Sequence, residues 1–459
     1  MKFGGSCLKN VNDFSTVADI ICEEIGEKVV VLSGINGITD KLISFIRKKY
    51  KEEDIEKLIS EVKHIHLNIV KGAVSRKEFY KMAKEKIEEK LKVLERLLYG
   101  VHYVGELTDK TRDLILSYGE RLTVIVMESI LNSRGAAAKA FEGDKIGIIT
   151  DGNFGNATAD LSLVERNLKK HILPFIERGF TPVITGFFGC DDEGRTTIFG
   201  RNGSDYSASV IAYALDADVV EIWKDVDGFM SADPKFVKEA YLLDSLSYDE
   251  AAELAYFGAR ILHPRTVEPL KLKKIPLKIR NLYRRDRGTL IHSIKKISKD
   301  SVVKSVAYKE EIGALKIYGA GVGSMLGVLG EITRYLSEEN INIKSVITSQ
   351  TCITLLLEKE DVEKSYRILK SKKIRTVERL EKIPGISLIG IVGNGILEYP
   401  GIAAKVFNAV AKRGINVEMF AAGASEVAFY FIVKQKYLRD AVESIHKVFF
   451  RGGKDNAKT

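Results

Sequence analysis

A glycine-rich turn with groups that could bind an amino acid stands out in the middle of the chain. Residues 200–206 read Gly-Arg-Asn-Gly-Ser-Asp-Tyr and are expected to begin a helix. Free backbone N–H groups and the helix dipole favour anions at such a helix N-terminus. Arg201 can hold a carboxylate through two parallel hydrogen bonds, and Asp205 can hold an ammonium. The residues also allow a simpler alternative, in which Ser204 or Asp205 only caps a helix over 206–215.

The elements around this turn predict an α/β fold. Residues 145–290 alternate apolar strands with helices; the strands are expected at Pro182 to Thr185, Val219 to Trp223 and Pro276 to Ile279, and the helices at 206–215 and 248–256. This alternation predicts a three-layer α/β/α domain with a mainly parallel sheet covered on both faces. Ligands of such sheets bind beyond the carboxyl ends of the strands, where the glycine-rich turns fall.

The first part of the chain follows the same plan. A short strand ends within Lys2–Ser6, and Val29–Leu32 reads as a buried strand. A loop over 33–37 then leads to a helix that opens near Thr39 or Asp40. Residues 41–140 are expected to be mostly helical.

The last third of the chain contains a repeat. Gly319-Ala320-Gly321 recurs as Gly393-Asn394-Gly395, Gly327 as Gly401 and Ile341-Asn342-Ile343 as Ile415-Asn416-Val417, each at an offset of 74 positions (393 − 319). Each copy reads strand, helix, strand, strand, helix. A fixed period of this length predicts two equivalent α+β units.

Composition narrows the class of protein. The 459 residues favour two or three domains, and the apolar runs fall far short of the ~20 residues of a membrane span. The N-terminus shows no apolar stretch that could act as a signal sequence. Four cysteines without metal or disulfide spacing favour a reducing cytoplasm. The net charge of +9 does not favour nucleic-acid binding, because lysines alternate with glutamates along 41–113 as on solvated helices.

Two further motifs suggest functions that we do not favour. Gly319-Ala320-Gly321-Val322-Gly323-Ser324 is similar to a dinucleotide fingerprint, but its last position is Ser324. The following strand, Ile341 to Ile347, ends without an acidic residue for a ribose. His263, next to Pro264, is interpreted as a structural residue rather than a base or ligand.

Over nearly its whole length the chain resembles the aspartate kinases of the amino-acid kinase fold with tandem C-terminal ACT domains. The resemblance rests on an ordered series of motifs: Lys2 to Ser6, Gly37 to Asp40, Ser117 to Leu122, Thr150 to Ala157, Ile184 to Phe187, Gly200 to Tyr206, Trp223 to Gly228, Asp233-Pro234 and Leu254 to Pro264. It implies a kinase domain at 1–295, a first ACT domain at 300–380 and a second at 381–459, with possible strand exchange between the ACT units. Because the chain ends at Thr459 after the second unit, a monofunctional kinase is expected rather than a kinase fused to a dehydrogenase.

The resemblance implies ATP-dependent phosphorylation of the L-aspartate β-carboxylate, the first step of aspartate-derived amino-acid biosynthesis. Lys2 would stabilise the transferring phosphoryl group, Arg201 would bind the α-carboxylate, and Glu120 and Asp205 would hold the amino group or organise the residues that do. The other implied aspartate-binding residues are Ser33, Thr39, Phe187, Gly203 and Ser204. The implied ATP-binding residues are Lys2, Phe3, Gly4, Gly5, Lys224, Asp225, Met230, Lys235 and Arg260. Mg2+ would arrive with the nucleotide rather than in a cage of side chains.

Several positions depart from the family pattern. Lys224 stands where threonine is usual, Asn202 where a glycine is usual, Met230 where tyrosine is common and Arg260 where lysine is usual. Arginine and lysine differ in geometry although they share a charge. These departures bear on nucleotide affinity rather than on the reaction.

The tandem ACT units predict a homodimer or larger homo-oligomer and a feedback effector. Met325, Gly327, Ser349 and Gln350 are the candidate effector residues. By the resemblance, Lys344 takes the place of an acidic residue that faces the side chain of lysine in lysine-inhibited relatives, and like charges repel. Threonine is therefore favoured over lysine. Cys352 and Ala428 replace an asparagine usual in both units, so a purely dimerising role stays open.

Two other functions remain as alternatives. The first is phosphorylation of another small acid such as glutamate, against which Glu120 and the tandem ACT units count. The second is an amino-acid sensor without catalysis, which would not need Lys2.

Overall fold

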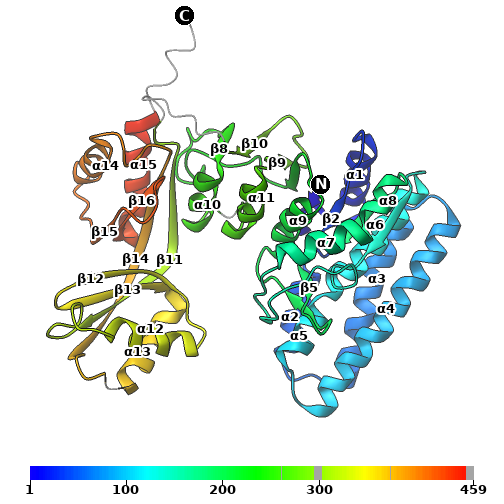
Figure 1. Ribbon diagram of the computed structural model, residues 1–459, viewed down its shortest axis with the longest axis horizontal. Coiled ribbons are helices and arrows are strands. Elements are labelled where there is room, and N and C mark those ends of the chain that lie inside the picture. The colour runs from blue at the N-terminus through cyan, green and yellow to red at the C-terminus, as the bar shows by residue number, and fades with distance from the viewer. Residues whose placement is uncertain (260, 294–301, 373, 451–459) are drawn as a thin grey trace, which may run out of the picture. The chain divides into compact units, whose positions relative to one another are not determined.

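The computed structural model describes residues 1–259, 261–293, 302–372 and 374–450 (Figure 1). The chain forms two compact units. The first comprises Met1–Phe229, Leu242–Ala252 and Arg260–Ile294, and the second Met230–Tyr241, Glu253–Ala259 and Lys295–Thr459. Two stretches expected in the kinase domain, 230–241 and 253–259, thus belong to the second unit. The expected boundaries at 295, 300 and 459 lie outside the described residues.

The first unit is built on an eight-stranded sheet in the order β3-β4-β2-β1-β7-β9-β10-β8. Its neighbouring strands are parallel except for β9 and β10, so the expectation of a mainly parallel sheet is confirmed. The strands are β1 (Lys2–Phe3), β2 (Val30–Leu32), β3 (Ala138–Phe141), β4 (Thr181–Thr185), β7 (Val220–Lys224), β8 (Ser245–Ser247), β9 (Leu277–Asn281) and β10 (Gly288–His292). A separate antiparallel hairpin consists of β5 (Phe188–Cys190) and β6 (Thr196–Ile198).

Both faces of this sheet are buried, as strand β2 illustrates. Val30 and Leu32 join a hydrophobic core with side chains of α1, α3, α4 and α6, whereas Val31 joins another core with side chains of α7 and α9. Successive side chains of a strand point to opposite faces, so helices cover the sheet on both sides. The helices of this unit are α1 (Val11–Glu23), α2 (Ile38–Ile46), α3 (Glu52–Ala73), α4 (Lys77–Val104), α5 (Asp109–Leu116), α6 (Tyr118–Ser133), α7 (Leu161–His171), α8 (Leu173–Glu177), α9 (Gly203–Ala214) and α11 (Val267–Lys273). Helix α10 (Tyr248–Tyr256) begins in the first unit, and its residues from Glu253 on belong to the second.

The helix after the glycine-rich turn begins earlier than expected. Helix α9 starts at Gly203, and Asn202 precedes it in a left-handed conformation with φ of 57°. No side chain caps this helix end. The alternative in which Ser204 or Asp205 acts as the N-cap is therefore wrong.

The second unit contains a six-stranded antiparallel sheet in the order β12-β13-β11-β14-β16-β15. Its strands are β11 (Ser305–Tyr318), β12 (Ile343–Ser349), β13 (Cys352–Glu358), β14 (Arg379–Val392), β15 (Met419–Ala421) and β16 (Ala428–Lys434). Its helices are α12 (Val328–Glu338), α13 (Lys359–Lys372), α14 (Ile402–Ala411) and α15 (Leu438–Phe450).

Two long strands join the repeated halves of this sheet. β11 and β14 pair with each other, while the last half of β11 pairs with β13 and the last half of β14 pairs with β16. Each long strand therefore belongs to both α+β copies. The expected order of strand, helix, strand, strand, helix is confirmed in each copy.

The repeat extends to the turn that follows each long strand. A Cβ atom on Gly319 would lie 1.8 Å from the carbonyl oxygen of Thr376, and one on Gly393 would lie 1.8 Å from that of Val302. These carbonyl positions are again 74 apart (376 − 302). Glycine is thus required at these two positions, because the backbone of another segment lies too close for a side chain. This packing explains the glycine pattern that begins at Gly319 and is similar to a dinucleotide fingerprint.

In the described part of the chain, no helix is both long and apolar enough to cross a membrane.

Candidate active site

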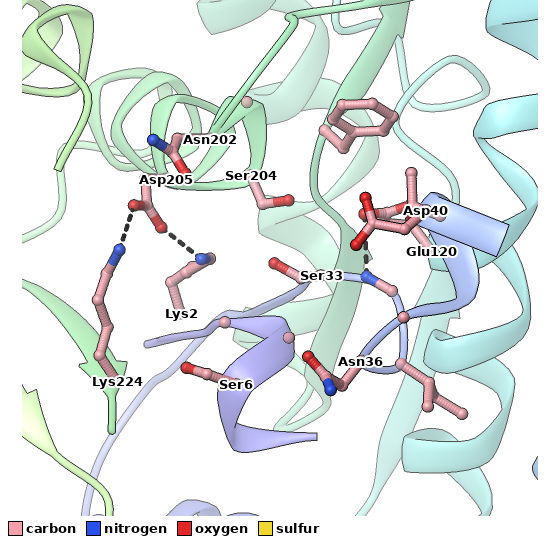
Figure 2. Close-up of a pocket in the computed structure, with 18 residues that line it drawn as sticks. Lys2, Ser6, Ser33, Asn36, Asp40, Glu120, Asn202, Ser204, Asp205 and Lys224 are labelled. Carbon is pink, nitrogen blue, oxygen red and sulfur yellow. Dashed lines mark hydrogen bonds and ion pairs between the residues drawn. The ribbon is translucent and has the colours of Figure 1, made fainter. Parts of the chain in front are cut away.

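A cavity of about 360 Å³ opens at the carboxyl ends of the central strands of the first unit (Figure 2). Residues that follow β1, β2 and β4, the end of β7 and the first turns of α2, α6 and α9 line it. The lining residues are Lys2, Gly4, Gly5, Ser6, Ser33, Gly34, Ile35, Asn36, Gly37, Thr39, Asp40, Glu120, Phe187, Asn202, Gly203, Ser204, Asp205 and Lys224. This is the edge of a parallel sheet at which the sequence predicts ligand binding.

An ion triad occupies one side of the cavity. Lys2 donates a hydrogen bond to Oδ1 of Asp205, and Lys224 donates one of 2.8 Å to Oδ2 (Figure 2). Lys2 is 4% exposed and Asp205 1%. Although burial opposes ionisation of Asp205, the charges of Lys2 and Lys224 lower the pKa of this carboxyl to about 2. For Lys2, burial lowers the pKa of the ammonium, and Asp205 opposes that effect.

Glu120 lies on the other side of the cavity, in the first turn of α6. The backbone N–H of Gly34 donates a hydrogen bond of 2.9 Å to its Oε1. Its Oε2 is buried without a hydrogen-bonding partner among the described residues. Burial raises the pKa of Glu120 to about 8, against the effect of the Gly34 hydrogen bond. A buried acceptor of this kind is suited to an ammonium group of a ligand.

A tight backbone turn places Phe187 in the wall. Phe187 has φ of 74°, and the N–H of Phe188 bonds to the carbonyl of Gly186 at 3.0 Å, which is a strained γ-turn. The start of α9 packs against this turn, because a Cβ atom on Gly203 would lie 3.3 Å from the carbonyl oxygen of Phe187. A Cβ atom on Gly186 would lie 2.7 Å from that of Ser204. Backbone strain of this kind tends to gather at functional sites.

Arg121 does not line the cavity but packs next to residues that do. Its guanidinium is buried, forms ion pairs with Glu142 and with Asp144, the latter at 2.6 Å, and lies 4.5 Å from the centre of the Phe188 ring. It therefore connects α6, which carries Glu120, with the hairpin that follows Phe187. Arg121 follows Glu120 directly in the Gly-Glu-Arg motif, and this position could have identified it from the sequence as a residue that supports the site.

Most predicted substrate residues and the glycines of the first turn meet in this cavity. These are Lys2, Gly4, Gly5, Ser33, Thr39, Glu120, Phe187, Gly203, Ser204, Asp205 and Lys224. The structure adds Ser6, Gly34, Ile35, Asn36, Gly37, Asp40 and Asn202, which sequence reasoning did not select although each adjoins a selected residue or motif.

Other predicted residues do not line the cavity. Phe3 is buried and stacks on Trp223 with ring centres 5.9 Å apart, so its side chain packs in the hydrophobic core. Arg201 is exposed. Asp225 pairs with Lys9 at 3.6 Å. Their assignments to substrate or ATP remain predictions.

The remaining residues that were predicted to bind ATP lie in the second unit or outside the residues that the structure describes. Met230 and Lys235 belong to the second unit, where the carbonyl of Met230 accepts a hydrogen bond of 2.8 Å from Ser305. Arg260 lies outside the described residues.

The effector candidates occupy two turns of the second unit. Met325 and Gly327 lie between β11 and α12, and Ser349 and Gln350 lie at the turn between β12 and β13. The two turns touch, because a Cβ atom on Gly323 would lie 1.8 Å from the carbonyl oxygen of Ser349.

Among the described residues, no group of three or more His, Cys, Asp or Glu side chains is arranged to hold a metal ion. Mg2+ in phosphoryl-transfer sites is held largely by substrate phosphates and water. That Mg2+ arrives with the nucleotide stays a prediction from the family resemblance.

Comparisons with known proteins show which family the chain resembles. A profile of the amino acid kinase family matches residues 1–281, and ACT domain profiles match 308–371 and 389–449. Aspartokinase 1 of Arabidopsis thaliana is 32% identical over 467 residues, which cover 99% of this chain and 80% of that protein. Aspartokinase 2 of Bacillus subtilis is 33% identical over 73% of this chain and 82% of that protein.

Solved structures give the same result. Aspartokinase III of E. coli, in complex with aspartate and ADP in its R-state, superposes with a TM-score of 0.84 at 27% identity and covers 98% of this chain and 99% of that one. The same enzyme with lysine and aspartate in its T-state gives a TM-score of 0.80 at 26% identity, over 98% of each chain. The profile, the relatives and the shared architecture show that the chain belongs to the aspartate kinases of the amino acid kinase family, with two ACT domains after the kinase fold.

Proposed function

We propose that the chain transfers the γ-phosphoryl group of ATP to the β-carboxylate of L-aspartate and so forms 4-phospho-L-aspartate. The observation that carries this proposal is the polarity of the cavity. Lys2 and Lys224 lie on one side of it, and Glu120 and Asp40 lie on the other (Figure 2). An amino acid with its ammonium toward Glu120 would direct an acidic side chain toward the lysines.

The reaction needs no general base in this cavity. The acceptor carboxylate is already ionised at neutral pH, so no proton has to be removed before attack. The protein has to align the reactants and neutralise charge on the transferring phosphoryl group. Lys2 would perform the second task, and its burial in the cavity with its ammonium bound to Asp205 supports this role.

The remaining substrate residues would position aspartate. Glu120 would accept from the ammonium, and Ser33, Thr39 and Ser204 would contribute hydroxyl groups. Arg201 would clamp the α-carboxylate after its exposed side chain turns inward. ATP would reach Gly4, Gly5 and Lys224 from the cavity, and Mg2+ would accompany its phosphates.

A hydroxamate assay for acyl phosphate tests the assignment. Purified protein with MgATP and millimolar aspartate should form the product, and glutamate should give little or none. Product from glutamate but not from aspartate would overturn the substrate. No product from either acid, in a protein that still binds amino acids, would favour a sensor.

The ACT pair is proposed to bind an amino acid made downstream of aspartate, with threonine favoured. Lys344 pairs with Glu358 at 3.1 Å, and Lys309 shares the same carboxylate at 2.6 Å. Two ammonium groups on one carboxylate leave a net positive charge, which disfavours the ammonium of lysine nearby. Calorimetric titration of the full chain with threonine and with lysine tests this. Heat from lysine alone at micromolar concentration would contradict it.

We also propose that the chain forms a homodimer or larger oligomer through residues 311–459. Edge strands such as β12 expose unpaired backbone groups that a second copy can cover. Light scattering at micromolar concentration tests this, and a monomer would contradict it. A cytoplasmic location stays a prediction from the cysteine pattern.

A further inference from the structure

We propose that the first unit contains a second ligand site, which binds a small organic dianion with an aromatic or apolar body. The site is a cavity of about 370 Å³ lined by residues of α2, of the turn over 47–51 and of the first half of α3. Its volume falls within the range of about 300 to 1,000 Å³ that is typical of small-molecule sites. It shares no lining residue with the candidate active site, although α2 contributes Asp40 to that site and Lys41 to this cavity.

The segment that borders this cavity departs from the charge pattern of the helices that follow it. Residues 41–51 contain five lysines or arginines and no carboxylate, whereas lysines alternate with glutamates further along the chain. On those helices opposite charges pair, as Lys63 of α3 does with Glu88 of α4 at 2.7 Å. Like charges that gather without carboxylates repel each other, and a bound anion relieves this repulsion.

The two carboxylates that line the cavity, Asp54 and Glu61, already have partners. Glu61 forms an ion pair with Lys41. Oδ2 of Asp54 accepts a hydrogen bond of 2.9 Å from the backbone N–H of Lys51. These contacts leave the other lysines of the lining without a carboxylate partner.

Those other lysines are Lys48, Lys49 and Lys57, which form no ion pair within the described part of the chain. Together with Lys41 they give the lining a surplus of two positive charges over its two carboxylates. Lysine presents a compact charge without the planar fork of arginine, so phosphate and carboxylate groups are both suitable partners. The surplus therefore favours a dianion, and the lysines do not select one type of acidic group.

An apolar floor adds a second requirement, because exposed lysines are well solvated and charge alone would not make a site. The floor consists of Phe45, Tyr50 and Leu58, and the centres of its two rings lie 4.4 Å apart. The hydroxyl of Tyr50 donates a hydrogen bond of 3.3 Å to the carbonyl of Leu98, and its ring stacks on His102. The floor is thus formed before a ligand arrives, which reduces the entropy cost of binding an aromatic or apolar group.

Fluorine NMR with aromatic anions tests the charge and the ring requirement on the full-length protein. 4-Fluorophenyl phosphate and 4-fluorophthalate are dianions at slightly alkaline pH, and they distinguish a phosphate ligand from a dicarboxylate ligand. At least one of them should bind about fivefold or more tightly than the monoanion 4-fluorobenzoate, because the surplus charge of the lining favours a dianion. The neutral 4-fluorobenzyl alcohol should bind more weakly still. Equal binding of the dianions and the alcohol would contradict the proposal, as would binding of neither dianion.

A triple variant, Lys48→Gln with Lys49→Gln and Lys57→Gln, locates the bound dianion. It should weaken binding about tenfold or more, since it removes the three lysines that have no carboxylate partner. The chain should fold, because these side chains are exposed.

Two controls separate this cavity from general charge and from the candidate active site. The matched triple variant replaces Lys77, Lys84 and Lys92, three exposed lysines of α4, by glutamine and changes the net charge equally. Lys2→Met alters the other cavity. Both should bind the dianion within about twofold of wild type, because neither changes the lining of this cavity. Equal weakening in the two triple variants, or loss of binding in Lys2→Met, would overturn the proposal.

Discussion

The backbone N–H of Gly34 donates a hydrogen bond of 2.9 Å to Oε1 of Glu120, which lies 86 positions further along the chain. The bond joins the loop after β2 to the first turn of α6. It satisfies one oxygen of a buried carboxyl, while Oε2 has no hydrogen-bonding partner among the described residues. Glu120 is therefore held in place through Oε1, while Oε2 remains available for a hydrogen bond to a ligand.

The first prediction is a pH-dependent stability that Glu120 controls. Its pKa is about 8 in the folded protein against 4.5 for the ordinary group. Between these values the folded state keeps a proton that the unfolded state has released, so the unfolding free energy falls as pH rises. The slope is at most about 1.4 kcal/mol per pH unit. Urea unfolding of the substrate-free protein from pH 5 to 8 should show this fall in wild type and a flatter dependence in Glu120→Gln. Parallel curves would show that Glu120 is ionised in the free protein.

The second prediction concerns the transfer step. Lys2→Met should lower kcat about 10²-fold and change the KM for aspartate little, because the ammonium counts most when charge develops on the phosphoryl group. Steady-state kinetics by the hydroxamate assay checks this. A variant with wild-type kcat and only a raised KM would assign Lys2 to ground-state binding.

The third prediction tests the exposed Arg201. Arg201→Lys should raise the KM for aspartate about tenfold although the charge is kept, since lysine cannot form the two parallel hydrogen bonds of a guanidinium. The KM for ATP should stay unchanged. Equal aspartate KM values in variant and wild type would mean that Arg201 remains in solvent during the reaction.

The fourth prediction concerns a hydrogen bond within the second unit, between the ACT sheet and residues 233–235, which belong to the segment that the sequence predicts to bind ATP. The hydroxyl of Tyr308 on β11 donates a hydrogen bond of 2.7 Å to Asp233, whose other oxygen accepts from the backbone N–H of Lys235 at 2.8 Å. Tyr308→Phe should loosen this segment and raise the KM for ATP about threefold to tenfold, with the aspartate KM unchanged.

Tyr318→Phe provides the control for this fourth prediction. Tyr318 lies at the other end of the same strand, where its ring lies 4.1 Å from the guanidinium of Arg379. The control should keep wild-type kinetics. An unchanged ATP KM in Tyr308→Phe would show that the hydrogen bond does not position the nucleotide segment.

The sequence by itself determined the α/β plan of the first unit, several of its strands and the repeat in the last third of the chain. Apolar runs gave β2, β4, β7 and β9 within a residue or two, since buried strands need continuous hydrophobic side chains. The offset of 74 gave two α+β copies because equivalent turns require equivalent glycines, as Gly319 and Gly393 demonstrate. The motif series gave the family and most of the residues that line the cavity.

Only the tertiary structure decided which distant residues meet. The pairing of Lys224 with Asp205 depends on the register of β1, β7 and α9, and no local pattern records that register. The sharing of β11 and β14 between the two copies, and the placement of 230–241 in the second unit, likewise arise from long-range pairing. Helix α9 begins at Gly203 because Asn202 adopts a left-handed conformation, which leaves Asp205 to bind lysines instead of capping the helix. Local propensity describes each segment alone, whereas these contacts depend on how segments far apart in the chain pack together.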